Sequence, residues 1–153
     1  NLEELPASLA NANAERLREL VLPYAVNTAE EHIEILDAQG LSVLSLRRRP
    51  NGNIEEFDSS RDSNEFANWE LVQKVLTNTF DQEGDKFAGV FQTERGLTFF
   101  VIGPIVSADN RAVGAVLVRL TSATSVTILR KRLSRPVPVA RSTNAPSTLS
   151  VPP

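Results

Sequence analysis

"GDKFAGVFQTERGLTFFVIGPIVSADNRAVGAVLVRLTS", residues 84–122, contains three apolar segments that we expect to form β-strands. The segments are Lys86 to Thr93, Leu97 to Val106 and Ala112 to Leu120. The polar connections between them, "ERG" and "SADNR", are so short that each strand must turn back beside the one before it. The stretch therefore predicts three antiparallel strands that are neighbours in chain order.

A second pair of strands lies upstream, in "EILDAQGLSVLSLRRRP", residues 34–50. Apolar residues alternate with polar ones from His32 to Asp37, which is typical of a strand with one buried face. The sequence "DAQG" supplies a turn into the next predicted strand, Leu41 to Arg47. This pair predicts a β-hairpin, which brings the expected number of strands to five.

Two further segments have the pattern of helices. The first, Pro6 to Val21, is rich in alanine, carries leucines on one face and is closed by Pro23. In the second, Ser63 to Phe80, apolar side chains recur at spacings of three and four behind a capping box of Asp62 and Glu65. The element order has no βαβ alternation and predicts an α+β fold. We expect about five antiparallel strands flanked by an N-terminal and a central amphipathic helix, in a PAS-like or profilin-like arrangement.

The composition excludes several classes of site and partner. The chain has no cysteine, and its single histidine, His32, cannot form a histidine metal cluster. All 19 acidic residues lie within residues 1–109, whereas residues 110–153 hold basic residues and no acid. The acidic body would repel a phosphate backbone, and the basic end has no aromatic residue to stack on a base. We therefore expect no nucleic-acid partner.

The pattern along the chain predicts three parts: residues 1–24 as an N-terminal helix, 25–135 as the PAS-like domain, and 136–153 as a Pro/Ser/Thr-rich linker or tail. A short basic helix is expected in "SVTILRKRL", before the tail. The chain begins with Asn1 and has no methionine, so we expect it to be a piece of a longer protein. Its apolar runs are shorter than the roughly 20 residues of a membrane span, so any membrane segment would lie outside it.

The chain resembles the Cache family of extracytoplasmic PAS-like sensor domains. Three stretches carry the resemblance, which is closest to the membrane-distal half of a double Cache sensor: "VNTAEEHIEILDAQGLSVLSLR", "FANWELVQKVL" and the stretch 84–122. The resemblance covers about residues 25–135. It implies an extracytoplasmic, ligand-binding sensor domain of a membrane-anchored bacterial signalling protein, with a kinase, cyclase or chemoreceptor output outside this chain. The arginine, tryptophan, tyrosine and aspartate set of amino-acid-binding members is not found here, which argues against an amino-acid ligand.

Five residues are candidates for a ligand-binding site. Arg47, at the end of a predicted strand, and Arg61, ahead of the second predicted helix, offer planar two-pronged donors to a carboxylate or phosphate. Trp69, Phe91 and Phe99 would line a pocket between helix and sheet. Each has a plainer interpretation, as a solvated arginine or a core aromatic. The sequence favours a small, anionic molecule bound near Arg47, Arg61 and Trp69.

No catalytic arrangement is recognisable in the sequence. The acidic residues of "DQEGD" lie in a polar loop, and His32 has no nucleophile at a recognisable spacing. We expect no enzymatic activity, metal site or cofactor in this domain. The N-terminal helix favours a homodimer contact. The alternative function is a PAS-like dimerisation or interaction module that binds no small molecule.

Overall fold

The protein is described by a computed structural model, which places residues 2–77, 84–93 and 96–120. The described residues all lie in the first of the two units into which the chain divides, residues 1–122. The basic helix expected in "SVTILRKRL" and the linker or tail expected at 136–153 lie outside the described residues.

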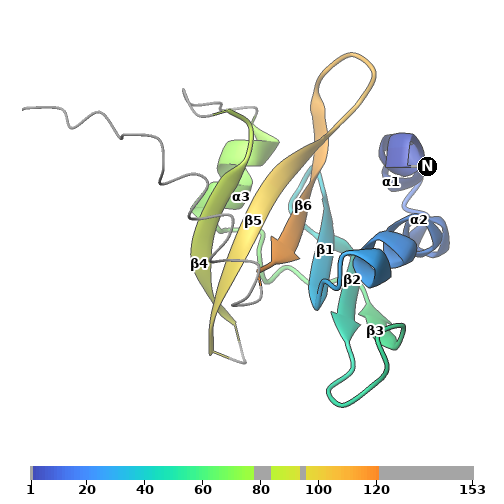
Figure 1. Cartoon of the computed structure of the whole chain (residues 1–153). Helices are drawn as coiled ribbons and strands as arrows, with labels where there is room; N and C mark the ends of the chain where they lie inside the picture. The colour runs from blue at the N-terminus through green and yellow to red at the C-terminus, as the bar shows by residue number, and fades with distance from the viewer. Residues whose placement is uncertain (1, 78–83, 94–95, 121–153) are drawn as a thin grey trace, which may run out of the picture. The chain divides into compact units, whose positions relative to one another are not determined.

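One antiparallel sheet of six strands forms the centre of the first unit, in the order β3-β2-β1-β6-β5-β4 (Figure 1). The strands are β1 His32–Asp37, β2 Ser42–Arg48, β3 Phe57–Ser60, β4 Phe87–Thr93, β5 Gly96–Val106 and β6 Ala112–Arg119. The predicted α+β fold is confirmed, with one strand more than expected. The additional strand is β3. Its sequence does not alternate apolar and polar residues, because Phe57 is its only apolar residue and also its only buried one.

The N-terminal helix is interrupted, contrary to the prediction of one helix from Pro6 to Val21. A 3₁₀ turn, Leu2–Glu4, leads into α1, Leu5–Ala10, and α2 follows at Ala14–Asn27. Ala12 separates the two helices with a left-handed φ of 47°, and the side chain of Asn13 accepts a hydrogen bond from Arg16 N at 3.0 Å to cap α2.

Pro23 lies inside α2 and does not end it. Leu17, Val21 and Ala25 are all buried on one side of this helix. Because this apolar stripe continues past the proline, core packing outweighs the backbone hydrogen bond that a proline removes.

The second predicted helix begins later than expected. The helix α3 covers Glu70–Leu76, and Trp69 precedes it in an extended conformation. Asp62 has a left-handed φ of 64°, so it does not form the predicted capping box with Glu65. Instead Glu65 N donates to Ser63 Oγ at 3.2 Å within a run of turns. The predicted end of the helix at Phe80 lies outside the described residues.

The helices cover opposite faces of the sheet: α2 lies beside β2 and α1 beside β6 and the end of β5, whereas α3 lies on the other face (Figure 1). Each face therefore has its own hydrophobic cluster. The buried residues under α1 and α2 are Leu9, Leu17, Val21, Ala25, Ile33, Ile35, Leu44, Leu46, Phe57 and Ile105. Those under α3 are Leu36, Phe66, Val72, Val75, Phe100, Ile102, Ala115 and Leu117.

Gly89 on β4 allows α3 to lie close to the sheet. A Cβ atom at this position would be 2.5 Å from Leu71 Cδ1 and 3.3 Å from the Trp69 ring. Because Gly89 has no side chain, Trp69 and Leu71 at the start of α3 can pack directly against β4.

Candidate ligand-binding site

A carboxylate is buried in the α3 side of the sheet. Glu34, in the middle of β1, is only 1% exposed. Its Oε1 lies 2.6 Å from His32 Nε2 and accepts a hydrogen bond from Ser45 Oγ at 2.6 Å, while its Oε2 accepts one from Ser42 Oγ at 2.7 Å. Arg47 Nη2 is a more distant donor, 3.2 Å from Oε1. The charge of Glu34 is therefore held by four side chains of β1 and β2.

A β-bulge makes this arrangement possible. Ser42 and Ser45 are three residues apart, so in a regular strand their side chains would point to opposite faces. The register between β1 and β2 shifts between Ile35 and Leu36, which places Val43 as an extra residue in β2. Both serine hydroxyls consequently reach the same carboxylate.

The surroundings of Glu34 favour its ionised form. Burial is the largest single effect and acts to raise the pKa, but hydrogen bonds from His32, Ser45 and Ser42, together with the charge of His32, outweigh it. The pKa of Glu34 is held below its ordinary value of 4.5. A buried carboxylate that remains charged gives this face of the sheet a fixed negative group beside the arginines.

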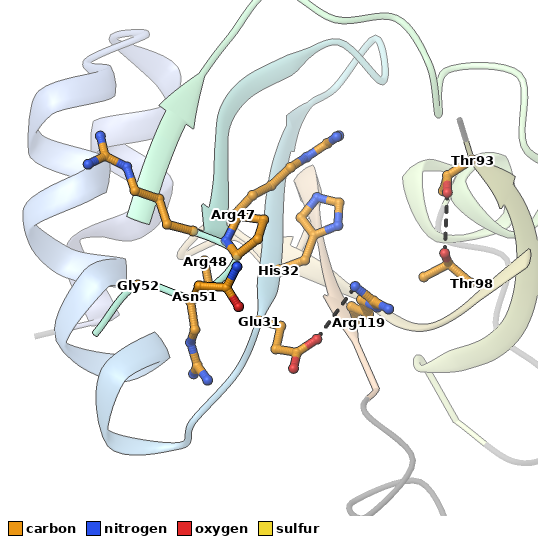
Figure 2. Close-up of a pocket in the computed structure, with 11 residues that line it drawn as sticks. Glu31, His32, Arg47, Arg48, Asn51, Gly52, Thr93, Thr98 and Arg119 are labelled. Carbon is orange, nitrogen blue, oxygen red and sulfur yellow. Dashed lines mark hydrogen bonds and ion pairs between the residues drawn. The ribbon is translucent and has the colours of Figure 1, made fainter. Parts of the chain in front are cut away.

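A pocket of about 320 Å³ opens beside this network, where β1 begins and β2 and β6 end (Figure 2). It is lined by Glu31, His32, Arg47, Arg48, Arg49, Pro50, Asn51, Gly52, Thr93, Thr98 and Arg119. The pairing of Ile33 with Val118 places His32 and Arg119 at adjacent positions of β1 and β6. Three consecutive arginines, Arg47 to Arg49, and the distant Arg119 thus border one cavity.

Arg47 is held only by long contacts within the protein. Its Nη2 is 3.2 Å from Glu34 and 3.5 Å from Glu65, and its Nε donates to Ser45 Oγ at 3.3 Å. These distances lie at the long end of the hydrogen-bond range, and the side chain is 33% exposed. Because Glu34 has three shorter contacts, it would stay hydrogen-bonded if Arg47 turned toward a ligand.

The other pocket arginines also have internal partners. Arg119 Nη1 lies 3.5 Å from Glu31 Oε2, and Arg49 Nε donates to Asp58 at 2.7 Å. Arg48 points to the opposite face, where its guanidinium lies 5.7 Å from the centre of the Phe57 ring and donates to the Glu30 carbonyl. The pocket therefore offers many N–H donors but little excess charge, and an anion would have to exchange with a carboxylate to bind.

The predicted site residues are distributed over both faces. Arg47 lines the pocket, as described. Trp69 and Phe91 lie on the same face, with ring centres 4.8 Å apart, in the aromatic cluster under α3. Phe99 pairs with Val90 and alternates with the buried Phe100, so its side chain is on the α1 and α2 face.

Arg61 lies apart from the other predicted residues. It is exposed, lies 3.4 Å from Asp62, and lines a separate hollow with Ala14, Glu15 and Arg18 of α2. The structure thus does not bring Arg61 to Arg47 and Trp69.

Sequence reasoning did not identify Glu34, His32 or Arg119 as site residues. Alternation with Ile33 and Ile35 indicated that Glu34 faces solvent. One signal was available: Leu36, two residues further along β1, shares the face of Glu34 and is apolar. An apolar residue such as Leu36 on this face of β1 indicates that other parts of the chain cover the face, and therefore that the Glu34 carboxylate is buried.

Two solved structures resemble this fold. One is a domain of a protein assigned to the sensory box/GGDEF family from Vibrio parahaemolyticus, with 16% identity, a TM-score of 0.53, and coverage of 76% of this chain and 46% of that one. The other is the extracellular domain of vpHK1S-Z8, described as a histidine kinase, with 16% identity, a TM-score of 0.55, and coverage of 82% and 47%. The fold is PAS-like. This chain spans slightly less than half the length of either protein.

The sequence matches no protein-family model and no curated protein. Among the described residues, no helix has the length and apolar character needed to cross a membrane.

Proposed function

We propose that the chain is the extracytoplasmic, ligand-binding sensor domain of a membrane-anchored bacterial signalling protein. The pocket at the strand ends is the observation that carries this proposal, because it gathers four arginines and His32 into a cavity the size of a small molecule. The PAS-like fold and the sensory proteins with similar structures support it. The domain itself would not be catalytic, and the output would be a kinase, cyclase or chemoreceptor domain outside this chain.

The proposed ligand is a small anionic molecule with a carboxylate or phosphate group. Guanidinium groups bind such groups through two parallel N–H donors. Arg47 and Arg119 border the pocket from the α3 face, and Thr98 on β5 adds a hydroxyl. Because the arginines already have carboxylate partners, recognition would depend on local geometry and not on long-range attraction.

The proposed signal begins at Arg47. This residue connects β2 to Glu65, which lies in the segment leading into α3. A ligand that draws Arg47 into the pocket would release Glu65 and favour a different packing of that segment. The response would be a shift between two populations of the domain.

A PAS-like interaction module without a ligand is the second candidate. It is favoured by the internal carboxylate or carbonyl partners of the four pocket arginines. Such pairing would give the strand ends a purely structural role.

A thermal-shift screen of organic acids and phosphate esters separates the two candidates. A ligand that binds only the native state, at a hundred times its dissociation constant, adds about 2.7 kcal/mol to the free energy of unfolding. For a chain of this length the Tm would rise by about 5 to 10 °C. The fluorescence of Trp69, the only tryptophan, should change as well, since its ring contacts Phe100 and Phe100 contacts His32.

The matched variants are Arg47→Ala, Arg119→Ala and Arg111→Ala. Arg111 is exposed and ion-paired with Asp109 in the turn between β5 and β6, at the other end of the sheet. The proposal expects the Tm shift to be lost in Arg47→Ala and Arg119→Ala and kept in Arg111→Ala. A shift that survives in all three would place the ligand elsewhere, and no shift with any anion would favour the interaction module.

A further inference from the structure

The edge strand β4 is a candidate for pairing with another chain. β4 is the last strand of the sheet, and no strand among the described residues pairs with its outer side. An edge strand presents a row of backbone N–H and C=O groups to which another chain can add. The residues from Phe87 to Gln92 would give a pairing segment longer than the whole of β3.

This edge lacks the usual protection against pairing. Natural edge strands are commonly short or carry charges or prolines. At the opposite edge, β3 is only four residues long, and its Asp58 is ion-paired with Arg49. By contrast, β4 and its neighbour β5 contain no charged residue, although 23% of the chain is charged.

Apolar side chains are exposed beside this edge. Val90 on β4 is 53% exposed and Leu97 on β5 is 75% exposed. Val90 pairs with Phe99, so its side chain lies on the face that carries α1 and α2. In the first unit α2 lies beside β2 and α1 lies beside β6 and the Val106 end of β5, away from β4 (Figure 1). Among the described residues, then, no helix covers the β4 end of this face.

We propose that β4 pairs antiparallel with β4 of a second copy of this chain, across a two-fold axis. An uncharged edge is compatible with its own copy, whereas the acidic remainder of the body would repel it. Val90 is the central residue of β4, so a two-fold axis at the centre of the strand places Val90 opposite Val90. Ala88 then lies opposite Gln92 of the partner subunit. The sheets of the two copies become one continuous sheet.

The homodimer contact predicted through the N-terminal helix is the alternative to pairing through β4. Leu9, Leu17 and Val21 are buried against the sheet of their own chain. Leu2, in the 3₁₀ turn before α1, is 46% exposed and is a suitable position to test a dimer formed through the N-terminal helix.

The absence of cysteine from the chain permits a direct test. In full-length chains, Val90→Cys places the only two thiols of the dimer opposite one another, within the reach of a disulfide. Mild oxidation should give a covalent dimer. Leu41→Cys is the control, because Leu41 is also apolar, is 44% exposed and lies far from β4 in the connection between β1 and β2. This variant should stay monomeric under the same conditions. An equimolar mixture of Ala88→Cys and Gln92→Cys should also cross-link if the register is as proposed.

Mass measurement by sedimentation gives an independent readout. The wild-type chain should change from monomer to dimer between about 1 µM and 1 mM, the range of weak to intermediate association. Val90→Lys, which opposes two charges across the axis, should remain monomeric while unfolding at nearly the wild-type temperature. A wild-type monomer at every concentration, or cross-linking through Leu2→Cys but not Val90→Cys, would overturn the proposal. Neither result bears on whether the pocket binds an anion.

Discussion

His32 Nε2 lies 2.6 Å from Glu34 Oε1, and both side chains are buried between the sheet and the segment leading to α3. The edge of the imidazole also contacts the Phe100 ring, with centroids 5.4 Å apart. His32 therefore joins the pocket, the buried carboxylate and the aromatic cluster. The stability of the domain should depend on this polar network more than on any surface ion pair.

Replacing the buried carboxylate should destabilise the fold. In Glu34→Gln the side chains of His32, Ser42 and Ser45 would face a neutral amide. Because an amide has one acceptor oxygen where the carboxylate has two, at least one of these side chains would lose its hydrogen-bond acceptor. We expect the free energy of unfolding to fall by about 2 to 4 kcal/mol, measured by urea denaturation. Glu70→Gln, whose side chain is 79% exposed, is the control and should change it by less than about 0.5 kcal/mol. If the two substitutions changed the free energy of unfolding equally, the buried network around Glu34 would not stabilise the fold.

The same comparison predicts a pH dependence. The pKa of Glu34 is lowered in the folded state, so its contribution is fully present above the ordinary value of 4.5 and is lost as the pH falls through the folded pKa. The stability difference between wild type and Glu34→Gln should shrink as the pH falls below 4.5. Burial raises the pKa of Glu30, which acts in the opposite direction, but this effect cancels because both proteins contain it.

The β-bulge should be detectable through Ser42. Its hydroxyl reaches Glu34 Oε2 only because Val43 is an extra residue. Ser42→Ala should lower the free energy of unfolding by about 1.5 to 3 kcal/mol, the range for a hydrogen bond to a charged group. Ser59→Ala on the exposed part of β3 should have almost no effect in the same denaturation experiment. If Ser42→Ala left the free energy of unfolding unchanged, the hydrogen bond from Ser42 to Glu34 would contribute nothing to stability.

Gly89→Ala should displace the start of α3. The new Cβ would lie 2.5 Å from Leu71 Cδ1, and overpacking of this kind costs about 1 to 3 kcal/mol. Gly103→Ala on the adjacent strand is the matched control, because its Cβ would only meet the flexible Lys86 side chain at 3.4 Å. Thermal unfolding should separate the two variants, and Trp69 emission should change only in Gly89→Ala. Indistinguishable melting curves and spectra would show that α3 tolerates the added atom.

Parts of the prediction were reliable because they rest on local pattern. Short polar connections forced neighbouring strands to be antiparallel, and five strands follow from alternation and turn residues. Helix boundaries were less accurate. The left-handed residue Ala12 interrupts a segment whose apolar spacing alone indicated a continuous helix. Turns at residues 65–68 delay the start of the helix that was predicted from Ser63. Spacing reports which side chains can share a face, but not where the backbone leaves the helical conformation.

The sequence by itself determined the α+β class, the antiparallel pairing, and the presence of Arg47 at a strand end beside two more arginines. Only the tertiary structure decided that Glu34 is buried, because the polar face of β1 is covered by a segment more than 30 residues away in the chain. It also decided which residues form the pocket, since Arg119 meets His32 through the pairing of β1 with β6. Alternation within a strand records the chemistry of its two faces. What covers each face, and which distant side chains satisfy a charge there, depends on long-range packing that no local pattern contains.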